Sequence, residues 1–375
     1  MIAGPQTHFT LPAELAAAEP PEARGLARDG VRLLAALPGR IEHARFHDLG
    51  NYLRPGDLLV VNTSATRSAA VDGAHPRLGA VVVHLSTPLD DGSWLVELRT
   101  APSADKPIRD ADAGEIVALP GEGRLRLLQR YPLMTSAGEP GRLWLADIEA
   151  PGGVGSLMAR HGRPIRYGYL SGQWPLDTYQ TVFAAEAPAE PGSAEMPSAG
   201  RPFSARLVTQ LVSSGVLFAS IVLHAGVSSL ETHEPPLAER YAVPARTAML
   251  VNWTHRVGGR VVAVGTTVTR ALESASRPDG SVVALQGWTD LVVGPDRPAR
   301  AVDGLVTGMH DPDASHLLLL EAVAGPDLVQ AAYDAALDER YLWHEFGDMC
   351  LLLPHQSVRR SQEILTTEQL DDAAC

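Results

Sequence analysis

VVAVGTTVTRALES, residues 261–274, runs from an apolar stretch through a glycine and two threonines into a segment with an arginine and a glutamate. Val261 to Val264 predicts a short buried strand, because apolar runs of this length bounded by turn residues are typical of one. Gly265 lets the chain turn closely after the strand. Thr266 or Thr267 can then cap a helix. The stretch therefore predicts a strand that turns directly into a helix, the unit from which α/β folds are built.

Two interpretations of this corner stay open on the sequence. Arg270 lies one turn into the predicted helix, and Glu273 follows it. Exposed amides at a helix start attract an anion, and an arginine one turn in can clamp a carboxylate through two hydrogen bonds. An ordinary capped helix with an internal pair between Arg270 and Glu273 explains the same spacing, and spacing alone favours it slightly.

Strands and helices alternate in the rest of this half of the chain. Apolar runs that end in polar or turn residues predict buried strands at 56–64, 217–226 and 349–354. Amphipathic segments predict helices at 204–214, 315–324 and 328–337. This alternation indicates a mixed α/β core domain.

The pattern of apolar segments and turns is different between residues 66 and 150. Short apolar segments such as SWLVELRT and GRLRLLQRY follow one another, separated by Asp-Gly, Pro-Gly and similar turns. Strands at such regular spacing predict a small antiparallel β-barrel. The predicted organisation is an α/β core formed by 1–65 and 151–354, a β-barrel inserted at 66–150, and a polar tail at 355–375.

Composition excludes several classes of function. The formal net charge of −13 disfavours a general nucleic-acid binder, although a local basic patch remains compatible with it. The chain has one lysine, Lys106, and it lies in the polar stretch SADKPIRD. A phosphate-binding P-loop and a pyridoxal phosphate enzyme each need a lysine in a particular setting, so both are disfavoured.

The chain shows no sign of export or of membrane insertion. No apolar run reaches the roughly 18 residues of a transmembrane helix, and the first residues lack a secretory pattern. Two cysteines, Cys350 and Cys375, are too few for a disulfide framework or a Cys-rich zinc site. We expect a cytoplasmic protein without membrane contact.

Two histidine segments are candidates for chemistry. His310 to His316 groups two histidines with two aspartates, and metal ligation there competes with helix capping by Asp313 or Ser315. The proline within the group and the lack of a second ligand cluster weaken the metal interpretation, so we expect no metal site. His224 ends a predicted buried strand, where α/β folds place ligand-facing groups, and a buried structural histidine is an equal alternative.

The chain as a whole resembles the S-adenosylmethionine:tRNA ribosyltransferase-isomerase family of queuosine biosynthesis, from Leu11 to Pro354. TYQTVFA and VGTTVTRALES are the most specific of the segments. The segments that carry the resemblance are RLL (32–34), FHDLGNYLRPGDLLVVNTS (46–64), DTYQTVFA (177–184), PSAGRPFS (197–204), LHAG (223–226), VGTTVTRALES (264–274), TGMHDP (307–312) and YLWHEFGDM (341–349).

The resemblance implies an α/β core with an inserted β-barrel, in agreement with the change of texture near Thr66. It also implies a reaction in which the ribosyl part of S-adenosylmethionine moves onto the aminomethyl group of a 7-deazaguanine in tRNA. The sugar isomerises to an epoxycyclopentanediol, and adenine and methionine are lost. S-adenosylmethionine is consumed as a substrate, so no cofactor is implied, and tRNA is the implied partner.

This chemistry sets the expected roles at the site. The sulfonium acidifies the 5′ carbon, so a base must remove a proton there, and the departing adenine favours a proton donor. We expect His224, His310 and Asp348 to act in catalysis, with Asp348 also able to bind ribose hydroxyls or an amine. The expected substrate-binding residues are Thr266, Thr267, Arg270, Glu273, Tyr179, Gln180, Gly226 and Asn62.

The sequence departs from the family pattern in several segments. A family histidine is replaced by Pro202, and another is lost at Pro236-Leu237-Ala238-Glu239. The losses suggest a retained S-adenosylmethionine pocket with an altered acceptor side. Two alternatives follow: a relative that cleaves S-adenosylmethionine or transfers from it to a small molecule, and a non-catalytic protein that binds S-adenosylmethionine.

Overall fold

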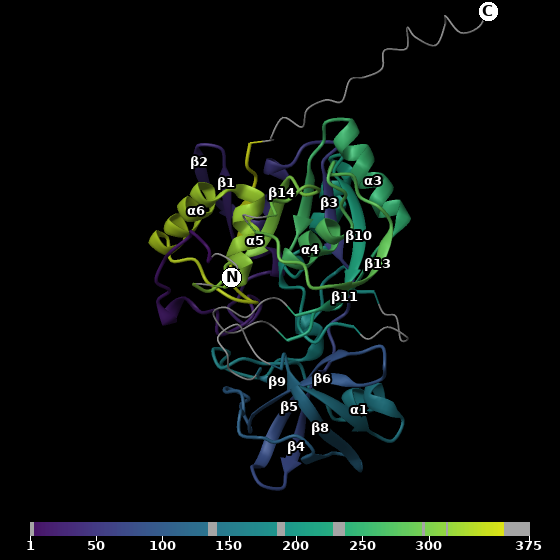
Figure 1. The fold of residues 1–375 in the computed structure, drawn as a ribbon. Coiled ribbons are helices and arrows are strands. Elements are labelled where there is room, and N and C mark those ends of the chain that lie inside the picture. Colours follow the sequence, from purple (N-terminus) through teal and green to yellow (C-terminus); the bar gives the residue numbers. More distant parts are fainter. Residues whose placement is uncertain are drawn as a thin grey trace, which may run out of the picture.

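The computed structural model describes residues 4–133, 141–185, 192–227, 237–294, 297–312 and 314–355. Figure 1 shows two bodies, an upper one built of a sheet and helices and a lower one built of strands. The polar tail predicted at 355–375 lies outside the described residues apart from His355.

The upper body is organised by a nine-stranded mixed sheet in the order β13-β11-β10-β3-β12-β14-β15-β1-β2. Its centre is parallel from β10 through β3 and β12 to β14, so four strand ends meet at one edge. Strand β15 runs antiparallel to β14 and parallel to β1. The strands are β1 (Arg32–Leu37), β2 (Arg40–Arg45), β3 (Leu58–Asn62), β10 (Leu217–Leu223), β11 (Glu239–Val243), β12 (Val261–Val264), β13 (Leu285–Thr289), β14 (Gly304–Gly308) and β15 (Met349–Leu352).

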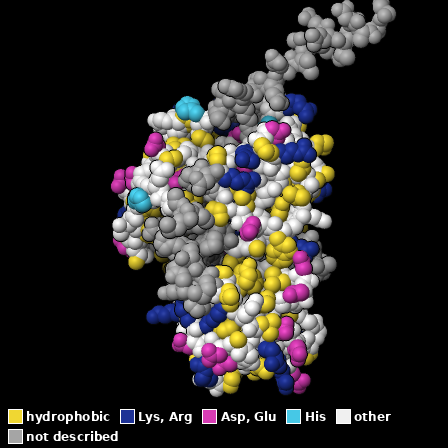
Figure 2. Space-filling model, in the orientation of Figure 1, with side chains coloured by type: hydrophobic (Ala, Val, Ile, Leu, Met, Phe, Trp, Pro, Cys, Tyr) yellow, Lys and Arg dark blue, Asp and Glu magenta, His cyan; other side chains and the backbone are white. Residues whose placement is uncertain are grey.

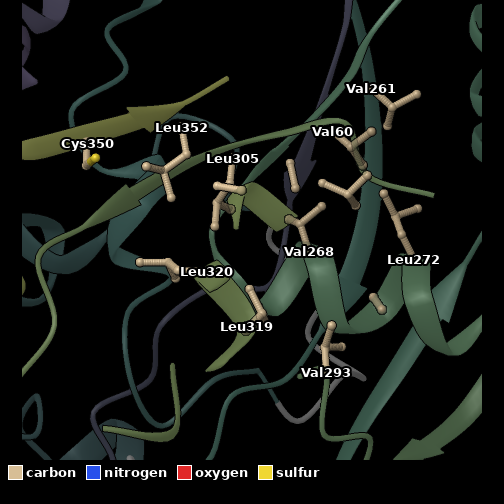
Figure 3. Packing of buried hydrophobic residues seen from close by; sticks show 14 of the residues in the cluster. Val60, Val261, Val268, Leu272, Val293, Leu305, Leu319, Leu320, Cys350 and Leu352 are labelled. Atoms are coloured by element: carbon tan, nitrogen blue, oxygen red, sulfur yellow. The ribbon is translucent and has the colours of Figure 1, made fainter. Parts of the chain in front are cut away.

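Helices cover both faces of this sheet, which explains why its central strands are apolar on both sides. One face is covered by α3 (Ala245–Arg256), α4 (Thr266–Ser274), α5 (Ser315–Ala324) and α6 (Pro326–Asp338). The other is covered by α2 (Ala205–Ser213) and the 3₁₀ turn η3 (Phe46–Tyr52). In Figure 3, Val268 and Leu272 of α4 lie near Val60 and Val261 of the sheet, and all four are buried.

The lower body is a closed antiparallel barrel in the order β4-β5-β6-β9-β8-β7. Its strands are β4 (Ala70–His75), β5 (Gly79–Pro88), β6 (Trp94–Thr100), β7 (Ile116–Leu119), β8 (Gly123–Tyr131) and β9 (Leu143–Glu149), followed by α1 (Gly153–His161). The predicted fold class, an α/β core with an inserted antiparallel barrel, is confirmed. The pattern of short apolar runs did not mark β4, whose sequence AVDGAH is neither apolar nor alternating.

Four charged or titratable side chains are buried on the face of the barrel that packs against the core, beside Val82, Leu143 and Tyr167. The Glu97 carboxylate accepts from Arg99 at 2.9 Å and pairs with Arg142 at 2.8 Å, and His84 Nδ1 lies 3.7 Å away. All four side chains are at most 2% exposed. Burial alone would raise the pKa of Glu97, but His84 and the two arginines outweigh it and lower the pKa to about 2.

Two connections join the barrel to the core, and they are bonded to each other. Ala70 and Arg163 exchange two backbone hydrogen bonds of 2.9 Å. Thr66 and Ser193 form a second, parallel bridge beside them. The entry into the barrel and the exit from it are therefore held together as one strip of structure.

The surface carries both signs of charge. Figure 2 shows hydrophobic side chains gathered where the core meets the barrel, and Lys and Arg side chains near the upper end of the core. Among the residues that the structure describes, every helix falls short of the length and apolarity needed to cross a membrane.

Candidate active site

A cavity of about 280 Å³ lies at the edge of the sheet where the parallel strands end. Its lining combines the ends of β12 and β14 with the first turns of α4 and α5. Segments that approach from the barrel side close it, among them Tyr167, Tyr169 and Glu195. This is where an open α/β sheet presents its strand-end loops to a ligand.

The corner at 264–267 forms part of this lining. Gly265 precedes α4 with a φ of 97°, which only glycine adopts without strain. Thr266 and Thr267 line the cavity, and neither side chain caps the helix, so the predicted cap is wrong. Asn62 Nδ2 lies 3.5 Å from Thr267 Oγ1 and donates to the Leu223 carbonyl at 2.8 Å, which ties the ends of β3 and β10 to the corner.

Arg270 is committed to protein partners. Its guanidinium pairs with the Glu239 carboxylate and donates to the carbonyls of Leu237 at 3.1 Å and Thr289 at 3.0 Å. The side chain borders the cavity and is 10% exposed. Arg270 therefore joins α4 to β11 and the end of β13, and the expected internal pair with Glu273 is replaced by the pair with Glu239.

Glu273 lies outside the cavity lining and has a structural role. The side chain is 1% exposed and accepts from the backbone amides of Arg300 at 2.9 Å and Ala301 at 2.8 Å. Burial raises its pKa, and these backbone bonds offset part of the effect.

His310 and His316 form a stacked pair on one wall of the cavity. Their ring centroids are 4.7 Å apart and the planes differ by 5°. His310 Nε2 lies 2.9 Å from Thr307 Oγ1. Burial, followed by neighbouring positive charge, lowers the pKa of His316 to about 4 and the pKa of His310 well below its usual value. Both rings are therefore neutral at physiological pH.

His224 lies behind the cavity wall. Its Nδ1 is 2.8 Å from Ser64 Oγ, and the side chain is 7% exposed. Burial, with the charges of Arg240 and Arg67, lowers its pKa to about 4. Gly226, two residues on, lines the cavity and donates its amide to Glu239 at 3.1 Å.

Gly226 also marks a close approach of the two bodies. A Cβ at this position would lie 2.7 Å from Ser86 Oγ and 2.8 Å from Thr87 Oγ1, both in β5 of the barrel. Ser86 Oγ accepts from the Val227 amide at 3.0 Å. The wall of the cavity is thus built against the barrel.

The remaining predicted residues lie outside the cavity lining. Asp348 is 4% exposed and accepts from the amides of Arg32 and Leu342, each at 2.8 Å. Tyr179 packs against Phe346 with ring centroids 5.3 Å apart. Gln180 bonds both main-chain groups of Thr66, at 3.0 and 2.8 Å. The contacts of these three side chains hold the surrounding segments in place.

The sequence interpretation missed two pairs of tyrosine and glutamate in the cavity wall. The Tyr167 hydroxyl donates to Glu195, and the Tyr169 hydroxyl donates to Glu345. The two tyrosine rings lie 6.2 Å apart at 26°. Glu345 belongs to the segment YLWHEFGDM, which the family resemblance included. The tyrosines lie between α1 and η4 (Leu176–Tyr179) without any periodic pattern.

The histidines and carboxylates of the cavity wall raise the question of a metal site. Within the described ranges, no three His, Cys, Asp or Glu side chains are grouped closely enough to hold an ion. Asp313, which the metal interpretation and the capping alternative both used, lies outside the described residues. Ser315 is the first residue of α5 and does not cap it.

Comparison with known proteins assigns the family. The family model described as queuosine biosynthesis protein matches residues 5–352. S-adenosylmethionine:tRNA ribosyltransferase-isomerases are 36% identical in Symbiobacterium thermophilum, 35% in Moorella thermoacetica and 33% in Thermotoga maritima, each over 92% of this chain and 98% of the relative. A solved S-adenosylmethionine tRNA ribosyltransferase from Thermotoga maritima is 29% identical over 92% of this chain and 99% of its own, with a TM-score of 0.49. The chain therefore belongs to the queuosine biosynthesis protein family.

Proposed function

We propose that this chain is an S-adenosylmethionine:tRNA ribosyltransferase-isomerase, which transfers and isomerises the ribosyl group of S-adenosylmethionine onto a 7-aminomethyl-7-deazaguanine in tRNA. The observation that carries the proposal is the cavity at the strand ends, walled by carboxylates and neutral histidines, in a chain that matches the family from residue 5 to residue 352. Relatives that carry this name span 98% of their own length in the match.

The charges of the cavity suit S-adenosylmethionine. The substrate carries a sulfonium and an ammonium, and the lining includes the carboxylates of Glu195, Glu239 and Glu345. The one carboxylate of S-adenosylmethionine suits the start of α4, where backbone amides and the hydroxyls of Thr266 and Thr267 face the cavity. We assign the methionine carboxylate to this corner. Arg270 acts there through Glu239, because its guanidinium already bonds that carboxylate and three backbone carbonyls.

His310 is the better placed of the two candidate histidines. It lines the cavity, and as a neutral ring it donates a hydrogen bond without carrying charge. We assign His310 to the adenine ring, where such a donor supports departure of the base. His224 holds the Ser64 hydroxyl behind the wall and positions the loop that leads to Gly226.

The acceptor is assigned to the side of the cavity that faces the barrel. Tyr167 and Glu195 lie on that side, and Tyr167 packs in a cluster with Leu143 of β9 and Val82 of β5. A carboxylate suits the aminomethyl group of the acceptor base, which is a cation at neutral pH. The tRNA therefore meets both bodies of the protein.

Turnover with defined substrates tests the proposal. The purified chain is incubated with S-adenosylmethionine and a tRNA that carries the precursor base, and the nucleosides and small molecules are analysed by mass spectrometry. We expect adenine and methionine to appear in step with the modified nucleoside, and neither to appear with tRNA that carries guanine instead. Adenine and methionine without a modified nucleoside would favour cleavage or a small-molecule acceptor, and binding without turnover would favour a non-catalytic protein.

A further inference from the structure

We propose that Glu345, held by the hydroxyl of Tyr169, is the base that removes the proton from the 5′ carbon of S-adenosylmethionine. The inference rests on the proposed function and adds to it the identity of the group that starts the chemistry. It takes the place of the histidine bases expected from the sequence.

The geometry fixes this carboxylate on the cavity wall. Glu345 and Tyr169 both line the cavity, and they come from segments 176 residues apart in the chain. The His344 ring stacks on Tyr169 with centroids 4.2 Å apart and planes 15° apart. One carboxylate oxygen is thus held by the tyrosine, in a frame that does not depend on the ligand.

The surroundings of Glu345 make it a stronger base than an exposed carboxylate. The titratable groups that face it are Tyr169, Tyr179, His344 and Asp311. Burial raises the pKa of Glu345, and the hydrogen bond from Tyr169 offsets part of that rise. A carboxylate in such a setting accepts a proton more readily than one in water, and the same desolvated setting strengthens its attraction to a sulfonium.

The other carboxylates of the cavity are less suitable. Glu239 is neutralised by Arg270. The side chain of Asp311 is 55% exposed, so water solvates its charge. Glu195, like Glu345, accepts a hydrogen bond from a tyrosine, in this case Tyr167. The Tyr167 ring lies on the barrel side of the cavity, and the Arg99 guanidinium is 5.7 Å from its centroid. That side of the cavity is assigned to the acceptor, so Glu195 is expected to face the aminomethyl group rather than the 5′ carbon.

The histidines are weak bases for the opposite reason. Burial lowers the pKa of His316 to about 4 and that of His310 further below its usual value. A ring with so low a pKa gives little driving force for taking a proton from carbon. The same property suits a neutral hydrogen-bond donor, the role assigned to His310 above.

The step is balanced without a further reactant. The bond between the 5′ carbon and its hydrogen breaks, and its electron pair stays on the carbon, where the adjacent sulfonium stabilises it. The proton moves to a carboxylate oxygen of Glu345, which becomes a neutral acid. The combined charge of Glu345 and the substrate is unchanged, because the carboxylate becomes neutral while the positive sulfonium centre becomes a neutral ylide.

The experiment follows the hydrogen itself. S-adenosylmethionine with deuterium on the 5′ carbon is mixed with the full-length enzyme and precursor tRNA, and deuterium released to water is measured under single-turnover conditions. We expect the wild type to release deuterium as product forms, and Glu345→Gln to release it at least 1000-fold more slowly, the upper part of the usual range for a general base. The rates are measured at saturating S-adenosylmethionine, so that any loss of affinity on removing this carboxylate does not enter the comparison.

Asp311→Asn is the control, since it removes a carboxylate from the same cavity wall at a position whose side chain is 55% exposed and has no assigned role in the reaction. It should release deuterium within about tenfold of the wild-type rate. The proposal is overturned by release from Glu345→Gln within tenfold of the wild type, or by equal losses in the two variants. Failure of the wild type to release adenine and methionine would instead overturn the proposed function.

Tyr169→Phe provides a test that does not require Glu345→Gln to fold. Loss of the hydroxyl removes a hydrogen bond that lowers the pKa of Glu345. The acidic limb of the pH profile for deuterium release should therefore move upward by about one pH unit. An unmoved limb in a folded Tyr169→Phe enzyme would rule out Glu345 as the titrating base.

Discussion

Each body contains one buried cluster of glutamate and arginine side chains, and the two clusters differ in what surrounds them. In the barrel, Glu97 pairs with Arg99 and Arg142, and all three are at most 2% exposed. In the core, Glu239 pairs with Arg270, and both also border the cavity. The barrel cluster lies behind the cavity wall, on the barrel face that packs against Tyr167, whereas the core cluster forms part of the wall itself.

The difference separates stability from function. A cluster behind the wall bonds only to protein groups, so changing it should alter mainly the free energy of unfolding, rather than ligand affinity. A cluster on a cavity wall orders the loops that hold the ligand, so changing it alters both quantities. Four changes, taken from the largest expected effect to the smallest, test this contrast.

Glu97→Gln should have the largest effect, because it leaves two arginines buried without a counter-charge. We expect a loss of about 3–5 kcal/mol in the free energy of unfolding, measured by denaturant titration. Affinity for S-adenosylmethionine per folded molecule should be unchanged in calorimetry. Glu149→Gln, at an exposed position in β9, is the control and should lie within about 0.5 kcal/mol of the wild type. Lower affinity at full stability would contradict the separation of the barrel cluster from the ligand.

Arg270→Ala should affect both quantities. It leaves Glu239 buried and unpaired, and we expect a loss of about 3 kcal/mol in the free energy of unfolding. The dissociation constant for S-adenosylmethionine should rise at least tenfold, because the corner at the start of α4 loses its tie to β11. Adding Glu239→Gln should restore part of the stability, since the unpaired charge is then gone. Wild-type affinity in Arg270→Ala would show that the corner is ordered by other contacts.

The histidine behind the cavity wall predicts a pH dependence. The pKa of His224 falls from 6.5 to about 4 on folding, so the unfolded chain binds the additional proton between these values. Stability from His224 is therefore present above pH 6.5 and is lost as the pH falls toward 4, by up to about 3 kcal/mol. His224→Asn should flatten the fall of the unfolding free energy between pH 6.5 and 4, whereas His47→Asn on the surface should not. Parallel curves for wild type and His224→Asn would refute the assignment.

Folding raises the pKa values of Glu239 and Glu345, so their effect on stability has the opposite sign. The free energy of unfolding that they contribute falls as the pH rises above 4.5. Their contribution is common to the wild type and His224→Asn, so it cancels when the two curves are subtracted.

The smallest effect is expected at the start of α4. Thr267→Val removes one hydroxyl from the cavity wall and should raise the dissociation constant for S-adenosylmethionine about fivefold, the equivalent of one hydrogen bond of about 1 kcal/mol. Thr269→Val is the control, because Thr269 is fully buried and its hydroxyl bonds the Gly265 carbonyl at 3.3 Å. Equal affinities in Thr267→Val and the wild type would place the carboxylate elsewhere.

Local patterns predicted the strands and helices that they specify strongly. The apolar runs that became β3, β10, β12 and β15 lie in the centre of the sheet, where burial on both faces leaves a clear signal. Edge strands such as β2, with the sequence RIEHAR, bury only part of one face and gave none. The close turn at Gly265 is confirmed by its φ of 97°. The predicted cap by Thr266 or Thr267 is wrong, because α4 begins without a side-chain cap.

The site was less predictable, because its contacts join distant segments. Arg270 and Glu239 are 31 residues apart, and Tyr169 and Glu345 are 176 residues apart, so no local spacing reports either pair. Asp348 and Glu273 looked like chemical groups in the sequence, yet both satisfy backbone amides. A buried carboxylate that accepts hydrogen bonds from main-chain amides cannot be distinguished, from sequence alone, from one that faces a ligand.

The bridge between Ala70 and Arg163 has a mechanical consequence. The two chain crossings are bonded to each other, and the barrel is also held to the core beside them, because Val227 donates to Ser86 and Trp288 donates to Asp90. Any displacement of the barrel against the core would have to break several of these contacts at once, and one of them, at Val227, lies next to Gly226 in the cavity wall.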